Sequence, residues 1–127
     1  MGLKDYFEKT TGTGVLSTAD GSGHVNAAVY SRPHFLDGDT PAFIMRDRMS
    51  HENLGSNPRA VYLFKEDGPG YKGKRIYLKM TREEKNEDLI ASIQRRTYEE
   101  EVKEDRFLVF FEVVKERPLV GDGDTAP

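Results

Sequence analysis

Two arginines and a serine lie close together in Arg46-Asp47-Arg48-Met49-Ser50, where an apolar segment leads into a short helical one. A helix N-terminus carries unpaired backbone N–H groups and a partial positive charge, so an anion binds there readily. Arginine adds the bidentate donors that suit phosphate, and serine is a good N-cap. The segment therefore predicts a phosphate site. The alternative is that Arg46 and Arg48 are solvated strand-end charges and that Ser50 only caps its helix.

A second group of chemically capable side chains occurs in Asn26–His34. Tyr30, Ser31 and Arg32 are consecutive there, and an aromatic ring beside a hydroxyl and a guanidinium can line a flat pocket for a conjugated ring. The alternative is a half-exposed strand in which Tyr30 packs on its neighbour. The residues alone leave both interpretations open.

Other chemistries have less support. The glycines of the loop Asp67–Lys74 match neither a P-loop nor the dinucleotide fingerprint, so a surface turn or a dimer contact is the simpler interpretation. The histidines His24, His34 and His51 lack the paired spacing of a metal site, and we expect no bound metal. The chain has no Gly-x-Ser-x-Gly turn for a hydrolase nucleophile.

The apolar pattern predicts the elements that must position these groups. Leu3, Tyr6 and Phe7 form one stripe of a short helix over Leu3–Lys9. A turn cluster joins Val15–Thr18 to a second strand from His24, in which apolar residues alternate, so that one face is expected in the core. Further strands are expected over Ala42–Met45, Ala60–Phe64, Arg75–Met80 and Phe107–Val114, and further helices over His51–Ser56 and around Leu89, Ile90 and Ile93.

Short strands at regular spacing favour a mainly β (α+β) barrel over a doubly wound sheet. Phe107–Val114 is apolar at nearly every position, which is typical of a strand covered on both faces. We expect one domain over residues 1–118, a flexible tail over 119–127, and a solvated acidic connector over Thr97–Asp105.

Composition limits the class of protein. The 127 residues include no cysteine, which excludes a disulfide scaffold, a cysteine zinc site and thiol catalysis. The formal net charge is −3, which argues against bulk nucleic-acid binding. No run approaches the roughly 20 apolar residues that span a bilayer, and the first residues lack the apolar core of a signal peptide. We expect a soluble cytoplasmic protein with no nucleic-acid or membrane partner.

Three segments together resemble the pyridoxamine 5′-phosphate oxidase-like family of FMN-binding split barrels, namely Gly14–Gly21, Asn26–Phe35 and Arg48–Phe64. The most specific part is Asn53-Leu54 followed by Asn57-Pro58-Arg59 and an apolar strand. The resemblance covers about half of the chain. The small size is similar to that of the stand-alone FMN-binding proteins of the group.

The resemblance implies a six-stranded antiparallel split β-barrel with short flanking helices, a homodimer, and FMN in a groove between the subunits. It places around FMN the residues Tyr30, Ser31 and Arg32 along the isoalloxazine ring, Ile44 and Met45 beside the ribityl chain, and Arg48, Met49 and Ser50 at the phosphate. Many members have a basic residue where this chain has Met49, Ser50 or Ala28. Neutralisation of the phosphate would then rest on Arg46, Arg48 and Arg32.

The leading hypothesis is an FMN-binding flavoprotein that acts as an FMN-dependent oxidoreductase or electron-transfer protein. FMN would carry the redox chemistry, and no side chain stands out as a general base. Arg32 or Ser31 would donate to the N1–C2 region of the flavin. The alternatives are a non-catalytic flavin- or haem-binding or storage protein, and a ligand-free dimeric interaction module on the same fold.

Overall fold

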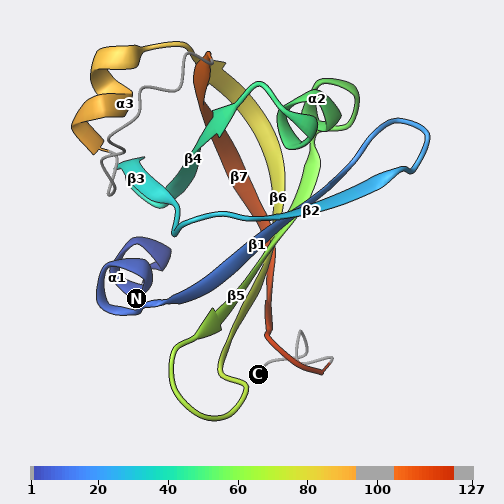
Figure 1. Ribbon diagram of the computed structural model, residues 1–127. Coiled ribbons are helices and arrows are strands. Elements are labelled where there is room, and N and C mark those ends of the chain that lie inside the picture. The colour runs from blue at the N-terminus through green and yellow to red at the C-terminus, as the bar shows by residue number, and fades with distance from the viewer. Residues whose placement is uncertain (1, 94–104, 122–127) are drawn as a thin grey trace.

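The computed structural model describes residues 2–93 and 105–121 of the chain. Its elements are, in chain order, α1 (Leu3–Lys9), β1 (Gly12–Ala19), β2 (Val25–Val29), β3 (His34–Asp37), β4 (Thr40–Arg46), α2 (Met49–Ser56), β5 (Arg59–Glu66), β6 (Gly73–Glu84), α3 (Glu87–Ile93) and β7 (Arg106–Pro118) (Figure 1). The expected acidic connector lies outside the described residues except for Asp105, and so does the expected tail from residue 122 onward. None of the described helices has the length and apolar character needed to span a bilayer.

The strands form one antiparallel sheet in the order β2-β1-β5-β6-β7-β4-β3. The sheet is not closed, because β2 and β3 are its edges. The mainly β architecture with short helices is therefore confirmed. The described residues contain one strand more than the six predicted. The additional strand, β3, has only four residues, and so short a segment shows no clear apolar period.

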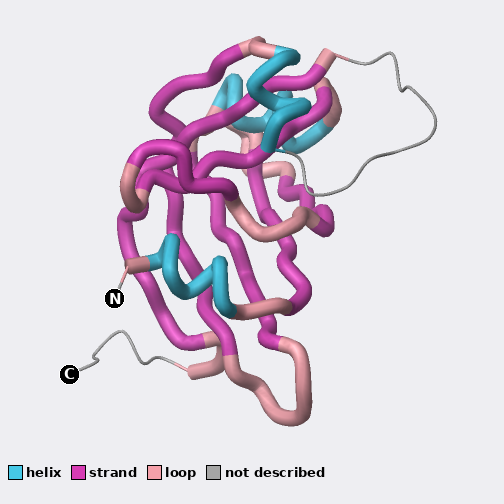
Figure 2. The backbone as a smooth tube through the Cα atoms, turned by 90° about the vertical axis from the view of Figure 1, so that its left-hand side faces the viewer, coloured by secondary structure: helices cyan, strands magenta, loops and turns pink. Residues whose placement is uncertain are grey.

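The main core contains several large aromatic side chains between the sheet and α1. Tyr62, Phe64 and Phe111 are fully buried there, and the Phe7 ring of α1 meets the Phe64 ring edge to face at 5.0 Å between centroids. Figure 2 shows α1 lying across the strands, whereas α2 and α3 lie at one end of the molecule. The predicted helix Leu3–Lys9 is confirmed, since its apolar stripe buries Leu3 and Phe7.

Strand β7 separates this core from a smaller one under α3. Val109 and Phe111 face the main core, whereas Leu108 and Phe110 pack with Ile90 of α3. The prediction of a strand covered on both faces is thus confirmed for this part of β7. Beyond Phe111 the strand is largely exposed.

Strand β2 presents its apolar residues to solvent, and the expectation that they face the core is wrong. The side chains of Val25 and Val29 are 81% and 75% exposed. The physical reason is that α2 packs on the other face of β2, where Asn26 makes a hydrogen bond to that helix. The edge position of β2 thus leaves an uncovered apolar stripe.

Candidate anion-binding site

Helix α2 begins at Met49, two residues before the predicted start, and Arg48 is its N-cap in an extended conformation (φ −128°, ψ −169°). The prediction that Ser50 is the N-cap is therefore wrong. Arginine has no acceptor atom, and Arg48 makes no side-chain capping hydrogen bond. The side chain of the N-cap residue therefore accepts no hydrogen bond from the backbone N–H groups of the first turn. This arrangement suits the binding of an anion.

Ser50 instead connects α2 to strand β2. Its side chain is almost fully buried, and its hydroxyl accepts a hydrogen bond from Nδ2 of Asn26 at 3.2 Å. The serine is therefore held in the second position of the helix by a residue far away in the sequence. Asn26 is absent from the predicted site residues, because only the fold brings it to α2.

Tyr30, just after β2, reaches the same turn. Burial raises the pKa of its phenol, while hydrogen bonding with Ser50 and the positive charge of Arg48 act in the opposite direction. The phenol remains protonated at neutral pH and can donate a hydrogen bond. The structure thus brings together Tyr30, Arg48 and Ser50, which the sequence presents as two separate clusters.

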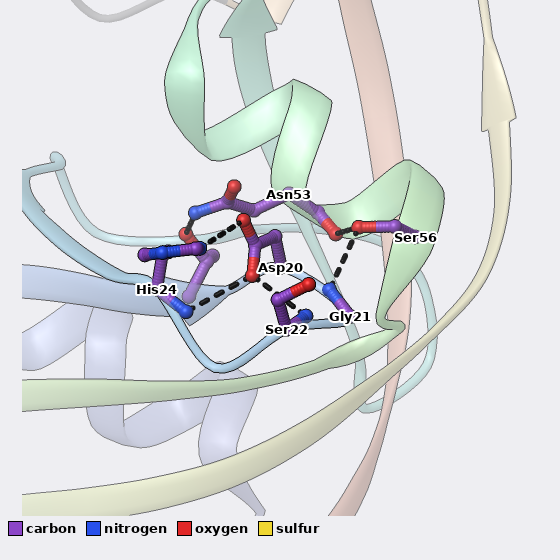
Figure 3. A network of polar contacts seen from close by, with 7 residues as sticks. Asp20, Gly21, Ser22, His24, Asn53 and Ser56 are labelled. Atoms are coloured by element: carbon purple, nitrogen blue, oxygen red, sulfur yellow. Dashed lines mark hydrogen bonds and ion pairs between the residues drawn. The ribbon is translucent and has the colours of Figure 1, made fainter.

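The β1–β2 hairpin makes two further contacts that hold α2 in place. Nδ2 of Asn53 donates to Oγ1 of Thr18 at 3.1 Å in a buried contact, and the Gly21 backbone N–H donates to Oγ of Ser56 at 3.1 Å. Figure 3 shows these bonds beside the turn that Asp20 shapes. Asn53 is part of the segment that carries the family resemblance, and this contact gives it a positioning role.

His51 makes contacts that the sequence analysis does not anticipate. Its Nδ1 lies 3.0 Å from Oδ1 of Asp47, its Nε2 lies 2.8 Å from Oε1 of Glu83, and its ring stacks on Phe107 with 4.1 Å between centroids. Burial lowers the pKa of His51, but the hydrogen bonds and charges of the two carboxylates outweigh burial and raise the pKa above its usual range. The spacing of Asp47 and His51 by four residues is the one signal in the sequence for this pair.

The remaining predicted residues occupy different surroundings. Met45 is fully buried in the main core, and Ile44 packs toward the smaller core under α3. Strand β3 pairs with β4 only as far as Ala42, so it does not cover the backbone of Ile44 and Met45. Met49 is 55% exposed on the first turn of α2, and Arg46 is half-buried at the end of β4.

Arg32 is engaged with helix α1. Its Nη1 donates to the backbone carbonyls of Phe7 at 2.6 Å and Thr10 at 3.1 Å, where the positive charge also complements the helix C-terminus. The side chain therefore has a structural role, whereas the neighbouring Ser31 is exposed. The roles of Arg32 and Ser31 toward a flavin stay predictions.

Solved structures include several with the same fold. An FMN-binding protein from Syntrophomonas wolfei subsp. wolfei matches with a TM-score of 0.73 and 21% identity, covering 94% of this chain and 84% of that chain. A candidate pyridoxamine 5′-phosphate oxidase from Listeria innocua matches with a TM-score of 0.64 and 20% identity, covering 92% of this chain and 98% of that chain. The styrene monooxygenase flavin reductase from Pseudomonas putida S12 matches with a TM-score of 0.58 and 12% identity, covering 91% of this chain and 84% of that chain. No protein-family model and no curated protein matches the chain.

These likenesses define the class of fold. The chain has the fold of the pyridoxamine 5′-phosphate oxidase-like, FMN-binding split barrels, and the expectation of a split barrel is confirmed. At such low identities, the likeness reaches no further than the fold.

Proposed function

We propose that the protein binds FMN with the phosphate at the first turn of α2, and that it acts as an FMN-dependent oxidoreductase or electron-transfer protein. The observation that carries this proposal is the convergence of Tyr30, Arg48 and Ser50 on a helix start whose N-cap side chain supplies no cap. The solved structures of the same fold that are named for FMN or flavin support the choice of ligand.

The donor set fits a phosphate. Arg48 supplies a positive charge, the protonated phenol of Tyr30 supplies a hydrogen bond, and the first turn of α2 supplies backbone N–H groups. The Ser50 hydroxyl accepts from Asn26 and bonds with Tyr30, so in this proposal it orients the phenol toward the phosphate rather than toward the flavin ring. Ile44 and Met45 pair with β7 on one side of β4, and β3 leaves the other side open, so the residue whose backbone groups point to the open side is available to the ribityl chain. When bound, FMN supplies hydride or electron transfer, and the residues of this chain bind it and orient its ring.

We further propose a homodimer with the cofactor groove at the subunit interface. The exposed Val29 pairs with Val15 of β1, which pairs with Leu63 of β5, so that apolar side chains form a row across three strands. With Val25, this row makes an apolar patch on an edge of the sheet, and exposed apolar patches of this kind mark interaction surfaces. We propose that a second copy of the chain covers this patch.

The test compares FMN with riboflavin, which lacks the phosphate. We expect the wild-type protein to bind FMN at least about tenfold more tightly than riboflavin, because charge-assisted hydrogen bonds hold the phosphate. Substitution of Arg48→Ala together with Ser50→Ala should remove most of this preference. The matched control, Arg59→Ala with Ser22→Ala, removes an exposed arginine and an exposed serine elsewhere and should preserve it.

Two results would contradict the assignment. Equal losses for FMN and riboflavin in the double variant would show that these residues do not hold the phosphate. A purified protein that shows haem absorbance, or that ignores added FMN, would favour the alternative functions on the same fold.

A further inference from the structure

His51 is held between two carboxylates on separate elements. Asp47 belongs to the connection that leads from β4 into α2, and Glu83 lies near the end of β6. Both carboxylates are within hydrogen-bond distance of a ring nitrogen, at 3.0 Å and 2.8 Å, and the ring lies nearly parallel to Phe107 of β7, at 12° between planes. One side chain therefore connects the start of α2 to two strands.

This geometry requires a charged histidine. A neutral imidazole has one donor nitrogen and one acceptor nitrogen, whereas ionised carboxylates only accept. Both bonds therefore form together only when both ring nitrogens carry a proton. Loss of that proton leaves one carboxylate facing the lone pair of a ring nitrogen, so one of the two hydrogen bonds is lost.

The charged groups around the ring favour the protonated form. Asp47 and Glu83 contact it directly, whereas the ammonium of Lys85 lies 6.0 Å from the Phe107 centroid and pairs with Asp105 at 3.1 Å. The charged residues that follow next along these segments are Arg46, Arg48, Glu52, Arg82, Glu84 and Arg106, of which Arg82 pairs with Glu84 and Arg106 with Glu87. The two carboxylates are thus the charges in direct contact with His51.

The group formed by Asp47, His51 and Glu83 lies directly beside the proposed anion site. Asp47 immediately precedes the N-cap Arg48, and His51 is the third residue of the helix. We propose that His51 is a positioning residue whose imidazolium fixes the first turn of α2, so that the charge of His51 regulates phosphate binding on that turn. The regulation of phosphate binding rests on the proposed function, whereas the positioning of the first turn of α2 by His51 does not.

The first measurement needs no ligand. In NMR titrations of the wild-type protein, the backbone amide signals of Arg48, Met49 and Ser50 should shift with the same midpoint as the His51 ring. Glu83→Gln removes one charge, so both midpoints should move together to lower pH. His24→Gln is the matched control, because His24 forms a similar pair with Asp20 (2.9 Å) in the β1–β2 turn, and it should leave the titration unchanged.

The second measurement compares wild-type protein with His51→Gln in FMN and riboflavin binding from pH 5.5 to 8.5, roughly the range in which histidine and phosphate titrate. Because the phosphate of FMN titrates too, the measured quantity is the ratio of the two proteins' affinities. Wild type should bind FMN about fivefold more tightly at the acidic end, and the ratio should approach one as pH rises. Riboflavin should show no such trend.

The outcomes separate the two proposals. Amide signals that do not follow the His51 titration would overturn the positioning role, and an FMN affinity ratio that is independent of pH would overturn the regulation of phosphate binding. If the amides follow His51 but FMN does not bind at any pH, the positioning of the turn is supported and the proposed function is refuted.

Discussion

At the residue scale, Tyr30 illustrates how surroundings prepare a side chain for an anion. Burial raises the pKa of the phenol, so the group stays a neutral donor at neutral pH despite the nearby charge of Arg48. A neutral donor adds a hydrogen bond to a phosphate without adding charge. The positive charge in this group of side chains then comes from Arg48.

Removing this hydrogen-bond donor should weaken the binding of FMN and leave the binding of riboflavin unchanged. We expect Tyr30→Phe to reduce FMN affinity by about 1.5 kcal/mol, roughly tenfold, which is typical of a hydrogen bond to a charged group. Fluorescence titration of both ligands measures the effect. An unchanged FMN affinity would show that the phenol does not contact the phosphate.

The charge of His51 should also appear in the pH dependence of stability. The pKa of His51 is higher in the folded chain than in the unfolded chain, so the stabilisation is complete below the unfolded value, provided that Asp47 and Glu83 remain ionised, and is lost as pH rises through the folded value. Since both carboxylates are partly exposed, we expect a stabilisation of only about 0.5–1 kcal/mol. Urea denaturation of wild type and His51→Gln at several pH values measures it. A difference that grows toward alkaline pH would contradict this account.

At the element scale, Gly14 lets the Tyr62 side chain of β5 lie close against the backbone of β1. A Cβ atom at Gly14 would overlap the phenol of Tyr62, whose hydroxyl donates to the carbonyl of Tyr30 at 3.0 Å. The Tyr30 backbone N–H in turn donates to the Gly14 carbonyl at 3.0 Å. A side chain at Gly14 would therefore displace the residue that places Tyr30.

We expect Gly14→Ala to destabilise the protein by about 1–3 kcal/mol, as overpacking of a core does. Gly55→Ala is the matched control, because it adds the same methyl group in open space within α2, where alanine is favoured over glycine by about 1 kcal/mol. Thermal denaturation should show a lower Tm for the first variant and an equal or higher Tm for the second. A Gly14→Ala protein as stable as wild type would refute the close approach.

Elements that depend on their own apolar pattern could be predicted from the sequence, and those that depend on tertiary contacts could not. Helix α1 has its predicted bounds, because Leu3 and Phe7 themselves define its buried stripe. The start of α2 was misplaced, because Asn26 takes the Ser50 hydroxyl from a position 24 residues away. The apolar face of β2 was misassigned for a similar reason, since α2 covers the opposite face.

At the scale of the whole molecule, the uncovered edge of the sheet predicts self-association. If the apolar row from Val29 to Leu63 is a dimer interface, Val29→Asp places a charge in it and should convert a dimer into a monomer. Val120→Asp is the control at another exposed valine and should leave the dimer intact. Sedimentation velocity distinguishes the two states. A wild-type monomer would contradict both the dimer and a groove between subunits.

The most direct test of the account asks where the phosphate of FMN lies. Amide NMR spectra of the protein saturated with FMN and with riboflavin differ only through that phosphate. We predict that the largest differences fall on Met49, Ser50 and His51 in the first turn of α2. Differences centred instead on another part of the chain, such as the glycine-rich loop at residues 67–74, with the α2 signals unchanged, would contradict the account.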